Sequence, residues 1–131
     1  MTDAEDRPTG AACPAYEQVF VRTSWPSRDD KWLCILKAEP DEIAHRTGLR
    51  FTDGVDDLDY FREAALRLAS GRPVLLCRYL HDHGPGTAVS IDAADDAPGA
   101  LAELSAAFEL RMEDFVCINP EALGIEPPPI E

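Results

Sequence analysis

The alternation of apolar and polar residues predicts a β-hairpin near the middle of the chain. Residues 74–80 (VLLCRYL) are mostly apolar, residues 87–92 (TAVSID) alternate, and the polar stretch HDHGPG between them contains two glycines. Two short runs of this kind on either side of a glycine-containing loop are typical of paired strands. We therefore expect residues 71–94 to form the hairpin around which the rest of the chain is arranged.

Other apolar runs predict further strands. Residues 16–22 (YEQVFVR) and 31–38 (KWLCILKA) are rich in β-branched and aromatic side chains, and the polar turn at 23–30 between them predicts a second hairpin. The run at 31–38 is apolar almost throughout, which favours an interior position in a sheet. Residues 113–118 (EDFVCI) predict the last strand, and residues 49–52 predict a short strand or only a connection.

Two segments begin and end with helix signals. Residues 40–47 start with Pro40 followed by two acids, which suits the first turn of a helix, and Gly48 is a suitable left-handed cap. The second segment begins at Asp95 or Asp96, and its apolar residues have the spacing of a helix that packs on a sheet. These residues are Leu101, Leu104 and Phe108.

A further helix is predicted between Asp56 or Asp57 and Gly71, where the helical pattern is strongest. The apolar residues Leu58, Phe61, Ala65 and Leu68 fall on one helical face. Glu63 and Arg67 have the spacing of a helical ion pair. Gly71 and Pro73 then end the segment.

The element order ββα(β)αββαβ predicts an α+β fold. Strands occur in hairpins and helices follow them, so we expect a two-layer sandwich with a largely antiparallel sheet and helices on one face. A doubly wound parallel sheet would require strands to alternate singly with helices. We interpret residues 1–15 as a flexible lead-in, 16–118 as a single α+β domain, and 119–131 as a Pro-rich acidic tail with room for one helical turn.

Length and composition indicate a single domain with a core of its own. The chain has 131 residues, of which 45% are hydrophobic. It contains no apolar run long enough to cross a bilayer, and its N-terminus is acidic where a signal peptide is basic, so we expect a cytoplasmic protein. The preference for Arg over Lys, with abundant Ala and Gly, is typical of a GC-rich bacterial source.

The charge balance is the most unusual feature of the composition. The chain has 25 acidic and 12 basic residues, a net charge of -13, and the acids are spread along the chain. Binding to nucleic acid or to an anionic membrane is disfavoured, because both need cationic contacts. A basic protein partner fits this charge better.

Two groups of residues are candidates for contacting such a partner. The first is acidic and precedes the predicted helix at 56–70: Asp53, Asp56, Asp57 and Asp59. Helix capping is the alternative explanation for these acids. The second group is Trp25 and Arg28 in the first loop, because Trp and Arg often anchor interfaces. The alternative for Trp25 is that it folds over one end of the sheet.

Cys77, His81 and His83 are candidate metal ligands. Cysteine and histidine hold zinc, and the pattern CxxxHxH supplies three ligands within seven residues, with His45 as a further candidate. In an extended strand these residues would spread over roughly 20 Å, so a site requires a sharp bend after Leu80. The alternative is an exposed polar loop, in which case we expect no cofactor.

The same residues could provide thiol chemistry, with Cys77 as nucleophile and His81 or His83 as base. A position in the middle of a strand favours an inert thiol instead. Cys34 and Cys117 also lie in apolar runs, so we expect all three thiols to be buried, whereas Cys13 in the lead-in is expected to be exposed.

In size, acidity and α+β character the chain is similar to small bacterial immunity and inhibitor proteins, which cover a basic toxin or nuclease. The resemblance lies in composition and element order, and it implies a non-catalytic module that binds a basic partner. The alternative function is a small metal-binding or thiol enzyme that uses the loop at 77–83. A homodimer is a further arrangement that an exposed hairpin edge would allow.

Overall fold

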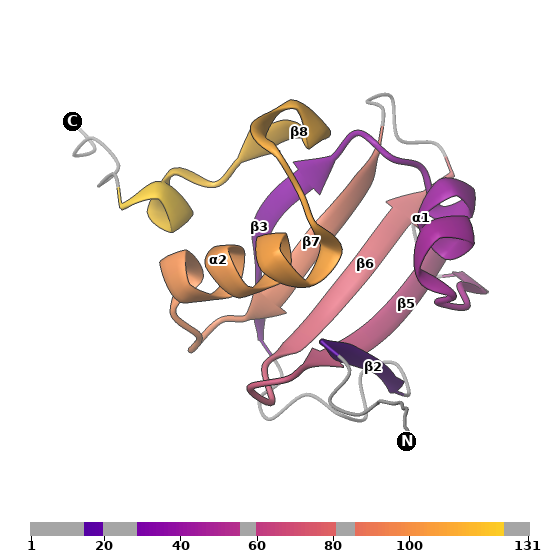
Figure 1. Ribbon diagram of the computed structural model, residues 1–131. Helices are drawn as coiled ribbons and strands as arrows, with labels where there is room; N and C mark the ends of the chain where they lie inside the picture. Colours follow the sequence, from indigo (N-terminus) through magenta and orange to yellow (C-terminus); the bar gives the residue numbers. More distant parts are fainter. Residues whose placement is uncertain (1–14, 20–28, 56–59, 81–85, 125–131) are drawn as a thin grey trace, which may run out of the picture.

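The computed structural model describes residues 15–19, 29–55, 60–80 and 86–124 (Figure 1). Within these ranges the chain forms a mixed α+β fold in which one antiparallel sheet of seven strands dominates. The elements are β2 (Tyr16–Val19), β3 (Asp30–Leu36), α1 (Pro40–Thr47), β4 (Thr52–Val55), β5 (Tyr60–Leu68), β6 (Pro73–Tyr79), β7 (Thr87–Asp92), α2 (Ala97–Phe108) and β8 (Phe115–Ile118), with 3-10 turns η2 (Met112–Asp114) and η3 (Pro120–Leu123).

The central hairpin is confirmed. Strands β6 and β7 pair from Val74 opposite Ile91 to Cys77 opposite Ala88. The strand order across the sheet is β2-β5-β6-β7-β3-β8, and β4 also pairs with β5. The predicted hairpin therefore occupies the centre of the sheet.

The predicted helix at 56–70 is wrong, because residues 60–68 form the interior strand β5. This strand pairs with β6 along one edge and with both β2 and β4 along the other. Ala64, Ala65 and Leu66 are all buried, so both faces of the strand are covered. A strand buried on both faces is apolar at successive positions and can match a helical stripe by chance. Pairing with three strands then outweighs the helix propensity of Ala, Leu, Glu and Arg.

The first predicted hairpin is also wrong, although both of its strands exist. β2 pairs with β5, whereas β3 lies on the other side of the central hairpin, between β7 and β8. The interior position predicted for residues 31–38 is thus confirmed, and Leu33, Cys34 and Leu36 are buried. The last predicted strand is present as β8, and the short strand expected at 49–52 lies three residues later as β4.

Both remaining helices are present. α1 has Pro40 in its first turn and ends at Gly48, whose φ of 79° is left-handed. α2 begins after Asp96, but Asp96 makes no side-chain capping hydrogen bond.

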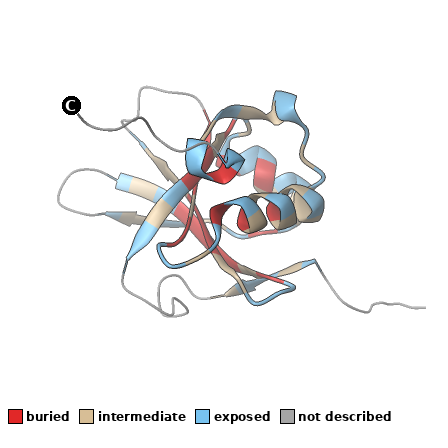
Figure 2. Ribbon diagram, turned by 90° about the vertical axis from the view of Figure 1, so that its left-hand side faces the viewer, coloured by how far each residue is buried: buried red, intermediate tan, exposed pale blue. Residues whose placement is uncertain are grey.

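Ile43 of α1 and Leu104 of α2 belong to one hydrophobic cluster with sheet residues such as Leu76. In Figure 1 both helices lie in front of the sheet, and Figure 2 shows the buried residues where helices and sheet meet. Neither helix in the described ranges is long and apolar enough to span a membrane.

A group of four polar residues, which we call the Arg72 clamp, ties the turn between β5 and β6 to α2. It consists of Ser70, Arg72, Asp95 and Glu103. The Arg72 guanidinium lies 3.1 Å from Asp95 Oδ1 and 2.8 Å from Glu103 Oε1, and the Ser70 backbone N–H donates to Glu103 Oε2 at 3.0 Å. The side chains of Arg72, Asp95 and Glu103 are only 26%, 16% and 22% exposed.

The Arg72 clamp favours the charged forms of Arg72 and Glu103. Hydrogen bonds to Glu103 and Asp95 raise the pKa of Arg72. Burial alone would raise the pKa of Glu103, but hydrogen bonds from Ser70 and Arg72 outweigh burial and lower it. The clamp therefore holds a salt-bridged network at the end of the sheet where α2 begins.

Candidate functional site

A hollow of about 680 Å³, which we call the Arg62 groove, lies between the start of α1, strand β4 and the ends of β5 and β6. Arg62 of β5 is one of the residues that line it. Its Nη1 donates to Asp41 Oδ1 of α1 at 2.8 Å, and its Nε donates to Asp53 Oδ1 of β4 at 3.1 Å. These two hydrogen bonds raise the pKa of Arg62. One guanidinium thus joins carboxylates from two different elements.

The carboxylates of the Arg62 groove face solvent. The side chain of Asp41 is 90% exposed and that of Asp53 is 80% exposed. The structure therefore places the predicted residue Asp53 beside Asp41, whose only predicted role was at the positive end of the α1 dipole. The two carboxylates remain accessible to an outside cation, because most of each side chain is open to solvent.

Exposed apolar side chains surround the same groove. Tyr60 is 62% exposed and Leu80 67% exposed, and both line it, while Val55 pairs with Tyr60 and is 64% exposed. Exposed apolar residues gathered in one place are typical of interaction surfaces, whereas single ones are ordinary. The groove therefore combines an apolar area with an acidic rim.

A hydrogen-bond network among Glu39, Arg78 and Gly86 fixes one side of the groove. The backbone N–H of Gly86 donates to Glu39 Oε2 at 2.7 Å, and Arg78 Nη1 donates to the Gly86 carbonyl at 3.0 Å. Gly86 has a φ of 93°, and a Cβ there would lie 1.8 Å from the Leu36 carbonyl oxygen. Only glycine fits this position, so the start of β7 is held against the beginning of α1.

Several candidate residues fall outside the described ranges. These are Cys13, Trp25, Arg28, Asp56, Asp57, Asp59, His81 and His83. Cys77 is half-buried in β6 and His45 is exposed on α1. The described part of the chain contains no group of three or more His, Cys, Asp or Glu residues arranged to hold a metal ion. The zinc prediction therefore stays a prediction.

The prediction of three buried thiols is correct only in part. Cys34 is fully buried, and burial, with a smaller effect of nearby Cys117, raises its pKa to about 12. Its thiol is therefore protonated and inert at neutral pH. Cys117 is exposed, because β8 lies at the edge of the sheet and its pairing with β3 is irregular between Ile35 and Leu36.

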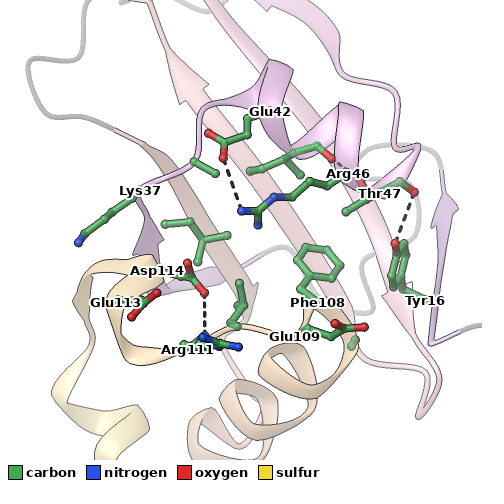
Figure 3. Close-up of a pocket in the computed structure, with 15 residues that line it drawn as sticks. Tyr16, Lys37, Glu42, Arg46, Thr47, Phe108, Glu109, Arg111, Glu113 and Asp114 are labelled. Atoms are coloured by element: carbon green, nitrogen blue, oxygen red, sulfur yellow. Dashed lines mark hydrogen bonds and ion pairs between the residues drawn. The ribbon is translucent and has the colours of Figure 1, made fainter.

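A second hollow of about 560 Å³, the inter-helix cleft, lies between α1 and the segment that connects α2 to β8 (Figure 3). Ile43, Phe108 and Leu110 provide apolar surface, and charged side chains stand around it. Arg46 lies 3.6 Å from Glu42, and the Arg111 backbone N–H donates to Asp114 Oδ2 at 2.7 Å. The two hollows share no lining residue.

The sequence did not predict which residues meet in the Arg62 groove, namely Asp41, Arg62, Tyr60 and Leu80. The prediction of a helix at 56–70 put Tyr60 and Arg62 outside the sheet, so their place beside β4 was not expected. A signal was nonetheless present, because polar residues such as Asp53, Asp56 and Asp57 between two short runs also suit a strand-loop-strand unit.

Comparison with known proteins adds no relative, since no family model, curated protein or solved structure matches the chain. The function is therefore argued from the geometry of the chain itself.

Proposed function

We propose that the chain is a non-catalytic, cytoplasmic module that binds a basic protein through the Arg62 groove, in the manner of an immunity or inhibitor protein that neutralises a basic toxin. The observation that carries this proposal is the placement of Asp41 and Asp53, both at least 80% exposed, beside the exposed side chains of Tyr60 and Leu80. This combination supplies both charge and apolar contact for a macromolecular partner.

The two kinds of residue have different effects on binding. The net charge of -13 and the exposed carboxylates attract a cationic protein and raise its association rate. The apolar side chains at the centre are desolvated on contact and slow dissociation. Asp56, Asp57 and Asp59, which follow β4 in the sequence, lie outside the described residues and stay candidates for contacting the same partner.

We also infer that the fold is the two-layer sandwich expected from the element order. The shared cluster of Ile43, Ala100 and Leu104 with strand residues supports helices on one face of the sheet. A homodimer formed by strand pairing is less favoured, because the described edge strands β2, β4 and β8 have four residues each.

The proposal is tested by capturing the partner and measuring its kinetics. Wild-type protein is used to recover a partner from the native host, and association rates are then measured between 20 and about 300 mM salt. The rate should fall steeply with salt. Asp41→Asn with Asp53→Asn should lower the rate by about tenfold at low salt.

A charge-matched control separates the groove from net charge alone. Glu17→Gln with Glu113→Gln also removes two exposed acids, but away from the groove, and should change the rate far less. Leu80→Ala should speed dissociation and leave the salt dependence unchanged. Equal effects of the two double variants, or a partner insensitive to salt, would refute the proposed surface.

The alternative enzyme at residues 77–83 has its own test. Elemental analysis of untagged protein and labelling of Cys77 in the native state would detect zinc or a reactive thiol. Stoichiometric zinc, or rapid labelling of Cys77, would favour that alternative over the binding module.

A further inference from the structure

We propose that the inter-helix cleft binds a carboxylate attached to a compact apolar body, either a free organic acid or the C-terminal residue of a peptide. This site is separate from the Arg62 groove and does not depend on the proposed function. The cleft volume of about 560 Å³ lies within the range of small-molecule sites, roughly 300 to 1,000 Å³.

The apolar surface of the cleft is already in place. Ile43 and Leu36 are 3% and 2% exposed and belong to the hydrophobic core, and Phe108 and Leu110 are partly buried against that core. Phe108 also packs edge-on against Tyr16, with ring centroids 5.0 Å apart. These contacts fix the floor, so an apolar ligand would bury surface without first ordering the protein.

Two arginines from opposite walls supply the positive charge. Figure 3 shows Arg46 extending from α1 over the cleft toward the side where Arg111 stands. Arg46 lies 3.6 Å from Glu42, and the two side chains are 54% and 55% exposed, so this ion pair is weak and exchangeable. For Arg111, no carboxylate of the described residues lies within ion-pair distance of the guanidinium.

Four acids also line the cleft, Glu42, Glu109, Glu113 and Asp114, beside the cations Lys37, Arg46 and Arg111. The Asp114 carboxylate accepts the backbone N–H of Arg111 at 2.7 Å and is held by that contact. Figure 3 shows Glu113 and Lys37 extending away from the middle of the cleft. Elsewhere Arg62 and Arg72 each contact two carboxylates already. Among the described residues, Arg46 and Arg111 thus bring guanidinium groups next to apolar surface, which is the chemistry that recognises an apolar carboxylate.

The test is an NMR titration of the whole chain with 3-phenylpropionate and, in a second arm, with N-acetylphenylalanine. Backbone amide shifts should change at residues 42–47 and 107–111. Tighter binding of 3-phenylpropionate identifies a free acid as the ligand class, and tighter binding of N-acetylphenylalanine identifies a peptide C-terminus. The neutral analogue 3-phenylpropionamide should bind at least about tenfold more weakly, because it lacks the charge-assisted hydrogen bonds.

Variants decide whether the arginines are responsible. Arg46→Gln and Arg111→Gln should each weaken binding by about tenfold. Arg46→Lys keeps the charge and should weaken it less, and Arg50→Gln, an exposed arginine outside the cleft, should leave it unchanged. Thermal melts confirm that each variant is folded. The proposal is overturned if neither acid shifts these amides at millimolar concentration, if the amide binds as well as the acid, or if the Arg46 and Arg111 variants match Arg50→Gln.

Discussion

Two arginines in this molecule make the same contacts in different surroundings. Arg72 and Arg62 each hold two carboxylates, with shortest distances of 2.8 Å in both cases. The carboxylates around Arg72 are 16% and 22% exposed, whereas those around Arg62 are 80% and 90% exposed. The chemistry is the same, and solvent access differs about fourfold. Partial burial makes the Arg72 clamp a structural contact, while exposure leaves the Arg62 groove available to a partner.

The largest effect on stability is expected from breaking the clamp. Arg72→Ala leaves Asp95 and Glu103 without their cation in a partly buried site, so the free energy of unfolding should fall by about 2 kcal/mol. Urea unfolding measures this loss. Arg50→Ala, at an exposed position, is the control. A loss no larger than that of Arg50→Ala would show that the clamp adds as little to the free energy of unfolding as the exposed ion pairs of the groove.

The clamp should also make stability depend on acidity. The folded-state pKa of Glu103 lies below its ordinary value of 4.5, so its contribution is complete above about pH 5 and is lost as pH falls through the folded pKa. The difference in unfolding free energy between wild type and Glu103→Gln should therefore be constant near neutral pH and shrink below about pH 4.5. Urea unfolding of both proteins from pH 3 to 7 measures it. A difference that is the same at every pH would contradict the lowered pKa.

The smallest effect on stability is expected from Arg62→Ala. Exposed ion pairs contribute little, so the midpoint of thermal unfolding should stay within error of wild type. Association with a basic partner should become faster, because Asp41 and Asp53 lose their internal cation. Lys31→Ala removes a cation paired with Glu121, away from the groove, and is the matched control. A large fall in the midpoint of thermal unfolding would show that Arg62 is a structural contact, as Arg72 is.

Local signals in the sequence were sufficient to predict most elements of the fold. The hairpin of β6 and β7, the interior position of β3, and helices α1 and α2 follow from apolar runs, glycine and proline positions and helical spacing. β5 could not be predicted in this way. Its residues have helix propensity, and its strand conformation depends on partners at residues 16–19, 52–55 and 73–79. The pairing of β2 with β5 is likewise nonlocal.

The candidate site was predictable only in its acidity. Asp53 was identified from charge, but its neighbours Asp41, Tyr60 and Leu80 come from α1, β5 and the residue after β6, and they meet through the sheet. The inter-helix cleft had no local signal, since it joins α1 to residues that follow α2.

The order of the strands in the sheet also affects how the sheet assembles while the chain is synthesised. β2 and β3 leave the ribosome first, yet their neighbours in the sheet, β5 for one and β7 and β8 for the other, are translated much later. β2 and β3 therefore lack these hydrogen-bonded strand partners until the later strands have been synthesised. The sheet is complete only after residues 115–118 have been synthesised, so a nascent chain stalled before them lacks strand β8.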